Sequence, residues 1–246
     1  MENLKNTYSE LPKEFHRSIN PTPVSKPKFL SLNRELAYEL SIDTFDEKNL
    51  LQYFSGNEVP EDSSTLAMVY AGHQFGNFVP QLGDGRAILL GELYDKKRKL
   101  NDIQLKGSGV TAFSRQGDGR SAIGPVIREY VLSEAMHAMN IPTTRALAAV
   151  STGENVSREA PLKGGILTRV SNSLIRIGTF EFFRARQDLE NLKVLADFTI
   201  NRLYPEISDE GNKYLLLFEA IAEKQSTLIS KWMSIGFIHG VMNTDN

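Results

Sequence analysis

The sequence contains no cysteine. This absence excludes a disulfide scaffold, a thiol nucleophile and a zinc site with cysteine ligands, and it is compatible with a reducing compartment. There is also no excess of one charge, because 28 Lys and Arg stand against 30 Asp and Glu and the formal net charge is −2. No overall basic character therefore points to nucleic acid. Any anion that the protein binds must be bound by a local cluster of cations.

Long hydrophobic runs are absent as well. The N-terminal stretch MENLKNTYSELPKEFHR has no apolar segment after a basic start, so it does not resemble a signal peptide. No segment approaches the roughly 18 apolar residues of a membrane helix. We therefore expect a cytoplasmic protein with no membrane partner. We also expect a monomer that has no nucleic-acid partner. Its 246 residues, 41% of them hydrophobic, are enough for one large domain or two small ones.

The order of predicted elements indicates an α+β fold. We expect short helices over 33–40 and 45–54, the second ending at Gly56, then a hairpin of strands 86–93 and 102–106, a helix over 123–139, a second hairpin over 164–177, and helices over 180–185, 188–202 and 213–235. A small β-rich lobe followed by a helical lobe is the layout of a protein kinase. We divide the chain into an N-terminal extension (1–60), a nucleotide-binding β-rich lobe (61–178) and the start of a helical lobe that the sequence cuts short (179–246).

The tetrapeptide Gly-Asp-Gly-Arg occurs twice, at 83–86 before a predicted strand and at 117–120 before a predicted helix. Glycine lets the backbone approach a phosphate closely, and the N–H groups of such turns and of helix N-termini bind anions. An Asp-Gly hairpin turn is the alternative for the first copy. Two copies so close together are harder to explain by turn chemistry alone. Neither copy is a Walker A loop or a Rossmann fingerprint.

Lys106 ends the second predicted strand, and Glu129 lies in the helix that follows. In protein kinases a strand lysine contacts the ATP phosphates and is held by a glutamate of the next helix. The order of glycine loop, strand, lysine strand and helix is the same here. The alternative is an ordinary surface lysine and an unrelated helix glutamate.

Two arginines and the last residues of the chain complete the candidates. Arg169 and Arg176 flank residues 170–175, and a pair of guanidinium groups suits a polyphosphate, although a solvated hairpin also uses arginines. The segment 239–246 has the seven-position spacing from His to Asn of a kinase catalytic loop, but position 241 is Val rather than Asp. Asp245, beside Asn246, is a candidate base. A frayed polar C-terminus is the alternative. His73, in a glycine-rich segment, receives no catalytic role.

Together these segments resemble the SelO family (selenoprotein O, also called the YdiU family). The resemblance is carried by YAGHQFGNFVPQLGDGRA from Tyr70, QLKGSGVTAFSRQGDGRSA from Gln104, IREY around Glu129, LTRVSNSLIRIGTFEFF from Leu167 and the terminal HGVMNTDN. It implies a protein kinase-like fold that binds ATP in a flipped orientation. It also implies the transfer of AMP to Ser, Thr or Tyr hydroxyls of proteins, with Mg2+ or Mn2+ as the metal.

The resemblance further implies a role for each candidate residue. Gly83, Gly85 and Arg86 would form nucleotide-loop contacts, Lys106 would bind phosphate with the support of Glu129, and Asp118 and Gly119 would contact the nucleotide. Arg169 and Arg176 would bind the inward-facing phosphate, Asp245 would accept the proton and Asn246 would be a metal ligand. Family members continue for roughly as many residues again and supply a second metal-binding aspartate in an Asp-Tyr-Gly motif. The sequence lacks that motif, so we expect this chain alone to be inactive or nearly so. The alternatives are a kinase that transfers the γ-phosphate and a non-catalytic ATP-binding pseudokinase fragment.

Overall fold

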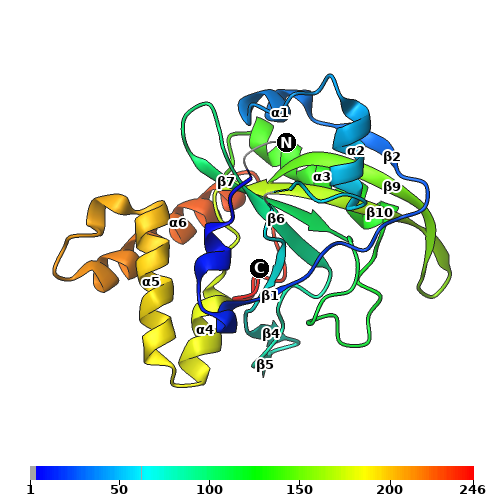
Figure 1. Cartoon of the computed structure of the whole chain (residues 1–246). Coiled ribbons are helices and arrows are strands. Elements are labelled where there is room, and N and C mark those ends of the chain that lie inside the picture. The colour runs from blue at the N-terminus through cyan, green and yellow to red at the C-terminus, as the bar shows by residue number, and fades with distance from the viewer. Residues whose placement is uncertain (1–3, 62) are drawn as a thin grey trace. The chain divides into compact units, whose positions relative to one another are not determined.

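The computed structural model describes residues 4–61 and 63–246 and shows a mixture of helices with one large antiparallel sheet (Figure 1). This agrees with the α+β class expected from the sequence. The chain divides into two compact units, each built from several segments. Unit 1 comprises residues 1–69, 82–137 and 143–174, and unit 2 comprises residues 70–81, 138–142 and 175–246. The three-part division into extension, β-rich lobe and helical lobe stays a prediction.

The sheet belongs to unit 1 and is antiparallel at every described pairing, in the order β1-β3-β6-β7-β10-β9-β2, with β8 paired to β10. The hairpin predicted from 86–93 and 102–106 is confirmed as β6 and β7. The strands are β1 (His16–Ser18), β2 (Lys28–Leu32), β3 (Leu66–Met68), β6 (Ala87–Tyr94), β7 (Leu100–Lys106), β8 (Ser121–Ala122), β9 (Arg145–Ser157) and β10 (Pro161–Ser171).

The second predicted hairpin, over 164–177, is wrong. Its residues form the second half of β10 and then lead into helix α4 (Ile177–Ala185). The partner of β10 is β9, and the connection between them lies at residues 158–160. That connection, Arg-Glu-Ala, contains none of the residues that favour turns, whereas Ser171-Asn172-Ser173 has the composition of one. The turn-favouring residues therefore lie at the end of β10, whereas the chain reverses direction before the start of β10.

Helices α1 (Arg34–Glu39) and α2 (Glu47–Ser55) pack on one face of the sheet, and α3 (Ile123–Ala138) packs on the other (Figure 1). The 3-10 helices η1 (Thr7–Glu10) and η2 (Lys13–Phe15) precede them. The carboxylate of Asp46 accepts the N–H of Asn49 at 3.0 Å and so caps the start of α2. Gly56 ends this helix in the left-handed conformation, with φ 74°, as expected from the sequence.

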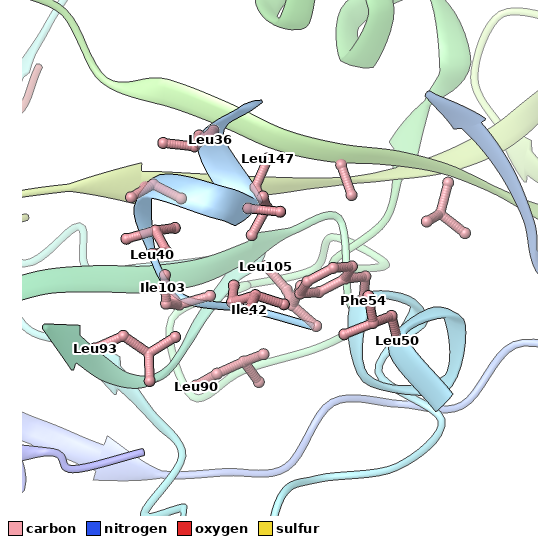
Figure 2. Packing of buried hydrophobic residues seen from close by; sticks show 14 of the residues in the cluster. Leu36, Leu40, Ile42, Leu50, Phe54, Leu90, Leu93, Ile103, Leu105 and Leu147 are labelled. Atoms are coloured by element: carbon pink, nitrogen blue, oxygen red, sulfur yellow. The ribbon is translucent and has the colours of Figure 1, made fainter. Parts of the chain in front are cut away.

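The main core of unit 1 lies between the sheet and the helices α1 and α2 (Figure 2). Phe54 of α2 is fully buried there, and burial of a side chain of this size contributes about 2 to 3 kcal/mol. Ile103 and Leu105 of β7 point into the same core. Because successive residues of a strand face opposite sides, Gln104 and Lys106 face the side of the sheet that α3 covers.

Unit 2 contains a two-stranded sheet and a group of helices, and its buried apolar side chains include Phe183 of α4, Ile200 of α5 and Leu217 of α6. Helix α5 begins at Asp188, whose carboxylate accepts the N–H of Asn191 at 3.0 Å. The three helices expected in this part of the chain are confirmed, and α4 begins three residues earlier than predicted. The elements are β4 (Gly72–Gln74), β5 (Asn77–Val79), α4, α5 (Leu189–Leu203), η3 (Pro205–Ile207) and α6 (Lys213–Ser234). No helix among the described residues has both the length and the apolar composition that spanning a membrane requires.

Candidate functional site

The ion pair expected between Lys106 and Glu129 is present in unit 1. Lys106 is the last residue of β7, and Glu129 lies in the second turn of α3. The Nζ atom of Lys106 donates to Oε2 of Glu129 at 2.6 Å, and the two side chains are 19% and 24% exposed. Such a short bond between half-buried charges fixes the end of the lysine side chain.

The other carboxylate oxygen of Glu129 accepts a hydrogen bond from Arg169 on β10. Here Nε of Arg169 donates to Oε1 of Glu129 at 2.5 Å. Arg169 lies directly opposite Gln104 in the pairing of β10 with β7, and its Nη1 donates to Oε1 of Gln104 at 3.3 Å. One carboxylate thus bridges two cations, and the Lys106–Glu129–Arg169 cluster keeps one net positive charge.

Burial and positive neighbours shift the pKa values of this cluster. Burial lowers the pKa of Lys106 to about 8, Arg169 and Arg86 act in the same direction, and Glu129 only partly opposes them. Burial raises the pKa of Glu129, but Arg169 and Lys106 outweigh burial and hold that pKa at about 2. Near neutral pH the carboxylate is therefore ionised beside two cations. A partly buried cluster with surplus positive charge favours an anionic ligand.

Both cations keep hydrogen-bond donors for such a ligand. Within the described residues, Lys106 donates one of the three hydrogen bonds that an ammonium group can make. Arg169 uses Nε and Nη1, and its Nη2 makes no hydrogen bond to the described chain. An ammonium beside a planar guanidinium matches the oxygens of a polyphosphate.

The first Gly-Asp-Gly-Arg copy, residues 83–86, joins this cluster from the neighbouring strand. Arg86 precedes β6 and is exposed, and its charge acts on Lys106. Gly83 has φ 69°, and a Cβ there would lie 2.3 Å from the ring of Phe113. Gly85 is similarly close-packed, since its Cβ would lie 2.8 Å from the main-chain oxygen of Phe113. Both glycines are thus required by packing, and their proposed contact with a nucleotide stays a prediction.

The second copy, residues 117–120, makes different contacts. The exposed carboxylate of Asp118 pairs with Arg158, which follows β9, at 2.8 Å. Hydrogen bonds from Arg158 hold the pKa of Asp118 below its usual value, although burial acts in the opposite direction. The guanidinium of Arg120 donates to the main-chain oxygens of Thr22 and Pro23, each at 3.1 Å. This copy therefore connects the β9–β10 hairpin to the N-terminal segment.

Gly119, in the same copy, has φ 64°, and a Cβ there would lie 2.0 Å from the main-chain oxygen of Gly109. Its own main-chain oxygen accepts the N–H of Gly109 at 3.1 Å. The main chain at Gly119 is thus in contact with the main chain at Gly109. The roles of Asp118 and Gly119 as nucleotide contacts stay predictions.

Asp245, the candidate base, lies in unit 2. Its Oδ1 accepts the N–H of His73 at 3.2 Å, and a Cβ on Gly72 would lie 2.4 Å from the same oxygen. The main chain next to it is fixed as well, because Gly178 donates to the oxygen of Thr244 at 2.6 Å. Residues 72–73 therefore contact this carboxylate directly, and Gly178 fixes the residue before it.

A chain of polar side chains runs beside Asp245. The hydroxyl of Thr244 donates to Oε2 of Glu181 on α4 at 2.5 Å, and Nδ1 of His73 lies 3.3 Å from the same hydroxyl. Sequence reasoning did not place His73 or Glu181 beside this segment. The available signal was a histidine directly after Gly72 in a glycine-rich segment.

Arg176 and Asn246 also belong to unit 2. Arg176 is the N-cap residue of α4, and its guanidinium lies over the ring of Tyr70, 4.3 Å from the centroid. The expectation that Arg169 and Arg176 flank one hairpin turn is wrong, because no hairpin forms there. The proposed binding of one phosphate by both arginines stays a prediction. The amide Oδ1 of Asn246 accepts the N–H of Asn243 at 3.0 Å and keeps a second lone pair, which suits a magnesium ion.

The chain is thus an α+β protein whose antiparallel sheet gathers a strand lysine, a helix glutamate and an arginine on one face. The chain belongs to the SelO family, as the resemblance of its motifs led us to expect: the family model described as "Protein adenylyltransferase SelO" matches residues 2–246.

Curated relatives are named "Protein nucleotidyltransferase YdiU". The relative in Agrobacterium fabrum is 57% identical over 100% of this chain and 51% of its own length. The relatives in Rhizobium meliloti and Maridesulfovibrio salexigens are each 57% identical over 98% of this chain and 49% of their own length. The chain thus spans about half the length of the curated relatives it matches.

Proposed function

We propose that this chain forms the ATP-binding part of a protein kinase-like nucleotidyltransferase, which transfers AMP from ATP to Ser, Thr or Tyr hydroxyls of proteins. The family and the names of its members support the reaction class. The observation that carries the proposal is the carboxylate of Glu129, which bridges Lys106 and Arg169 and leaves their remaining N–H groups for a polyanion.

In this proposal the positive cluster binds the phosphates that leave as pyrophosphate. Lys106 and Arg169 contact phosphate oxygens, Glu129 holds both cations in place, and Arg86 adds positive charge nearby. The residues to which we assign contacts with ATP or support of those contacts are Gly83, Gly85, Arg86, Lys106, Asp118, Gly119, Glu129, Arg169 and Arg176.

Asp245 is the proposed proton acceptor. The acceptor hydroxyl loses its proton to this carboxylate while its oxygen forms a bond to the α-phosphorus and the bond to pyrophosphate breaks. The N–H of His73 donates to the carboxylate and holds it in position. Gly72 leaves the space that the carboxylate occupies, because a Cβ there would collide with it. Asn246 would help to hold a Mg2+ or Mn2+ ion, which neutralises charge on the phosphates when it is bound.

Calorimetric titration of the chain with ATP tests the binding half of the proposal. Lys106→Ala removes a charge-assisted contact of about 2 kcal/mol, so ATP affinity should fall by about 30-fold. Lys163→Ala, at an exposed lysine of β10, is the matched control and should leave affinity unchanged. Equal affinities of wild type and Lys106→Ala would contradict the proposal.

Labelled ATP tests the transfer half. The chain is joined to the remaining part of the Agrobacterium fabrum relative, which matches it at 57% identity, and is incubated with Mg2+ and a mixture of proteins. Label that reaches protein from α-labelled ATP supports AMP transfer, whereas label from γ-labelled ATP alone identifies a kinase. Strong α-label transfer by the 246-residue chain alone would contradict the expectation that it is inactive without the second metal-binding aspartate.

A further inference from the structure

We propose that Gln104 is a positioning residue of the ATP site. The buried carboxylate of Asp84 sets the direction of the Gln104 side-chain amide, and the amide oxygen in turn fixes the guanidinium of Arg169 beside Glu129. The inference rests on the proposed function, because it assumes that Arg169 contacts the phosphates. It assigns a role to the aspartate of the first Gly-Asp-Gly-Arg copy, which the motif itself left unexplained.

Gln104 is placed where an amide must be fully paired. It is 0% exposed in the middle of β7, and its neighbours Ile103 and Leu105 face the opposite, apolar side of the sheet. A buried amide without partners costs roughly 1 to 3 kcal/mol for each unpaired group. Its partners are Asp84 on one side and Arg169 on the other.

The direction of the amide follows from a main-chain donor. The N–H of Met68 donates to Oδ2 of Asp84 at 3.1 Å, so this oxygen is an acceptor. The side-chain amide of Gln104 approaches the same oxygen at 3.2 Å, and only its NH2 end can donate there. The carbonyl end of the amide must then face away from Asp84.

That carbonyl end meets Arg169. Oε1 of Gln104 accepts from Nη1 of Arg169 at 3.3 Å, while Nε of the same guanidinium donates to Glu129 at 2.5 Å. Two acceptors on two edges of a planar group fix its plane as well as its position. Without Gln104 the guanidinium would be held at Nε alone. Ordering Arg169 before the ligand arrives reduces the entropy lost on binding.

Gln104→Met tests the inference, since methionine has similar length but no amide. We expect ATP affinity, measured by calorimetry on the 246-residue chain, to fall by about tenfold, the effect of roughly one hydrogen bond. Arg169→Met should weaken binding more. Because Gln104 acts through Arg169, the double variant should bind no more weakly than Arg169→Met alone.

Thr168→Val is the matched control. Thr168 precedes Arg169 on β10, is 0% exposed, and its hydroxyl makes no hydrogen bond within the described residues. This variant removes a buried polar group outside the network and should change ATP affinity by less than about twofold. Wild-type affinity in Gln104→Met, or a loss that adds fully to that of Arg169→Met, would overturn the inference.

A measurement on the wild-type chain covers the case in which Gln104→Met does not fold. In the NMR spectrum without ATP, the side-chain amide protons of Gln104 and the Hε proton of Arg169 should exchange slowly with solvent. Fast exchange of these protons would also overturn the inference. The proposed function fails separately, when Lys106→Ala binds ATP as tightly as the wild type does.

Discussion

Residues 83–86 and residues 117–120 have the same four amino acids, yet the aspartate of the first copy is 2% exposed and that of the second lies on the surface. Asp84 accepts hydrogen bonds from the main chain of Met68 and from Gln104, which connects it to the cluster around Lys106. Asp118 pairs with an arginine at the surface. The first copy therefore supports the proposed phosphate site from inside the protein, and the second joins surface segments.

The two copies also differ in the backbone conformation of their glycines. In the first copy the first glycine has positive φ (Gly83, 69°), and in the second copy the second glycine has it (Gly119, 64°). The glycines with positive φ also lie against different neighbours, Gly83 against Phe113 and Gly119 against Gly109. An identical tetrapeptide thus adopts two conformations because its surroundings differ.

The largest expected effect is at the glycines of the second copy. Gly119→Ala would place a Cβ 2.0 Å from a main-chain oxygen at positive φ, so we expect the free energy of unfolding to fall by more than about 3 kcal/mol, or folding to fail. Gly117→Ala is the control, with its nearest atom at 3.0 Å and no positive φ, and should cost less than about 1 kcal/mol. Urea unfolding measures both. Equal effects would mean that the second copy does not have the described conformation.

The two aspartates give the next comparison. Asp84→Ala leaves a buried N–H and a buried amide without their acceptor, and we expect it to lower the free energy of unfolding by about 3 kcal/mol. Asp118→Ala removes an exposed ion pair and should cost less than about 1 kcal/mol. Thermal unfolding of both variants checks the difference. Similar losses in both would remove the distinction between a buried and a surface copy.

The acid sensitivity of the buried cluster sharpens the contrast further. The pKa of Glu129 falls from an ordinary 4.5 to about 2 on folding, so the charged carboxylate stabilises the native state above pH 4.5. This contribution is lost as the pH falls from 4.5 to about 2 and should approach about 3 kcal/mol.

Glu129→Gln, followed by urea unfolding between pH 2 and pH 6, should show a correspondingly weaker dependence on pH than the wild type does. Identical pH profiles would show that Glu129 is not held as an ion pair in the folded protein.

The smallest expected effect is at the surface pair. Arg158→Ala should lower the free energy of unfolding by less than about 1 kcal/mol, and the difference from wild type should shrink at high salt. ATP titration of Asp118→Ala tests whether Asp118 also contacts the nucleotide. A large, salt-independent loss of stability would show that the pair is buried in solution.

Local patterns were sufficient for part of this structure. Gly56 and Asp188 mark helix ends at the predicted positions, because caps act within one turn of the chain. The pairing of Lys106 with Glu129 was predictable because a strand and the helix after it are close in sequence.

The remaining contacts depend on long-range register. Gln104 meets Arg169 because β7 pairs with β10 at one particular alignment, and no local signal sets that alignment. The contact of His73 with Asp245 joins residues 172 positions apart. The hairpin wrongly predicted at 164–177 shows the same limit. Residues 171–173 have the composition of a turn, but the strand that pairs with β10 is β9.

The dependence of ATP affinity on pH tests the central claim most directly. Because burial and neighbouring cations lower the pKa of Lys106 to about 8, this residue loses its charge above that pH. ATP affinity of the wild-type chain should therefore fall as the pH rises through about 8 and beyond, and Lys106→Arg should bind without that fall up to pH 10 or so. A wild-type affinity that stays constant from about pH 7 to pH 10, or an identical fall in Lys106→Arg, would contradict the account.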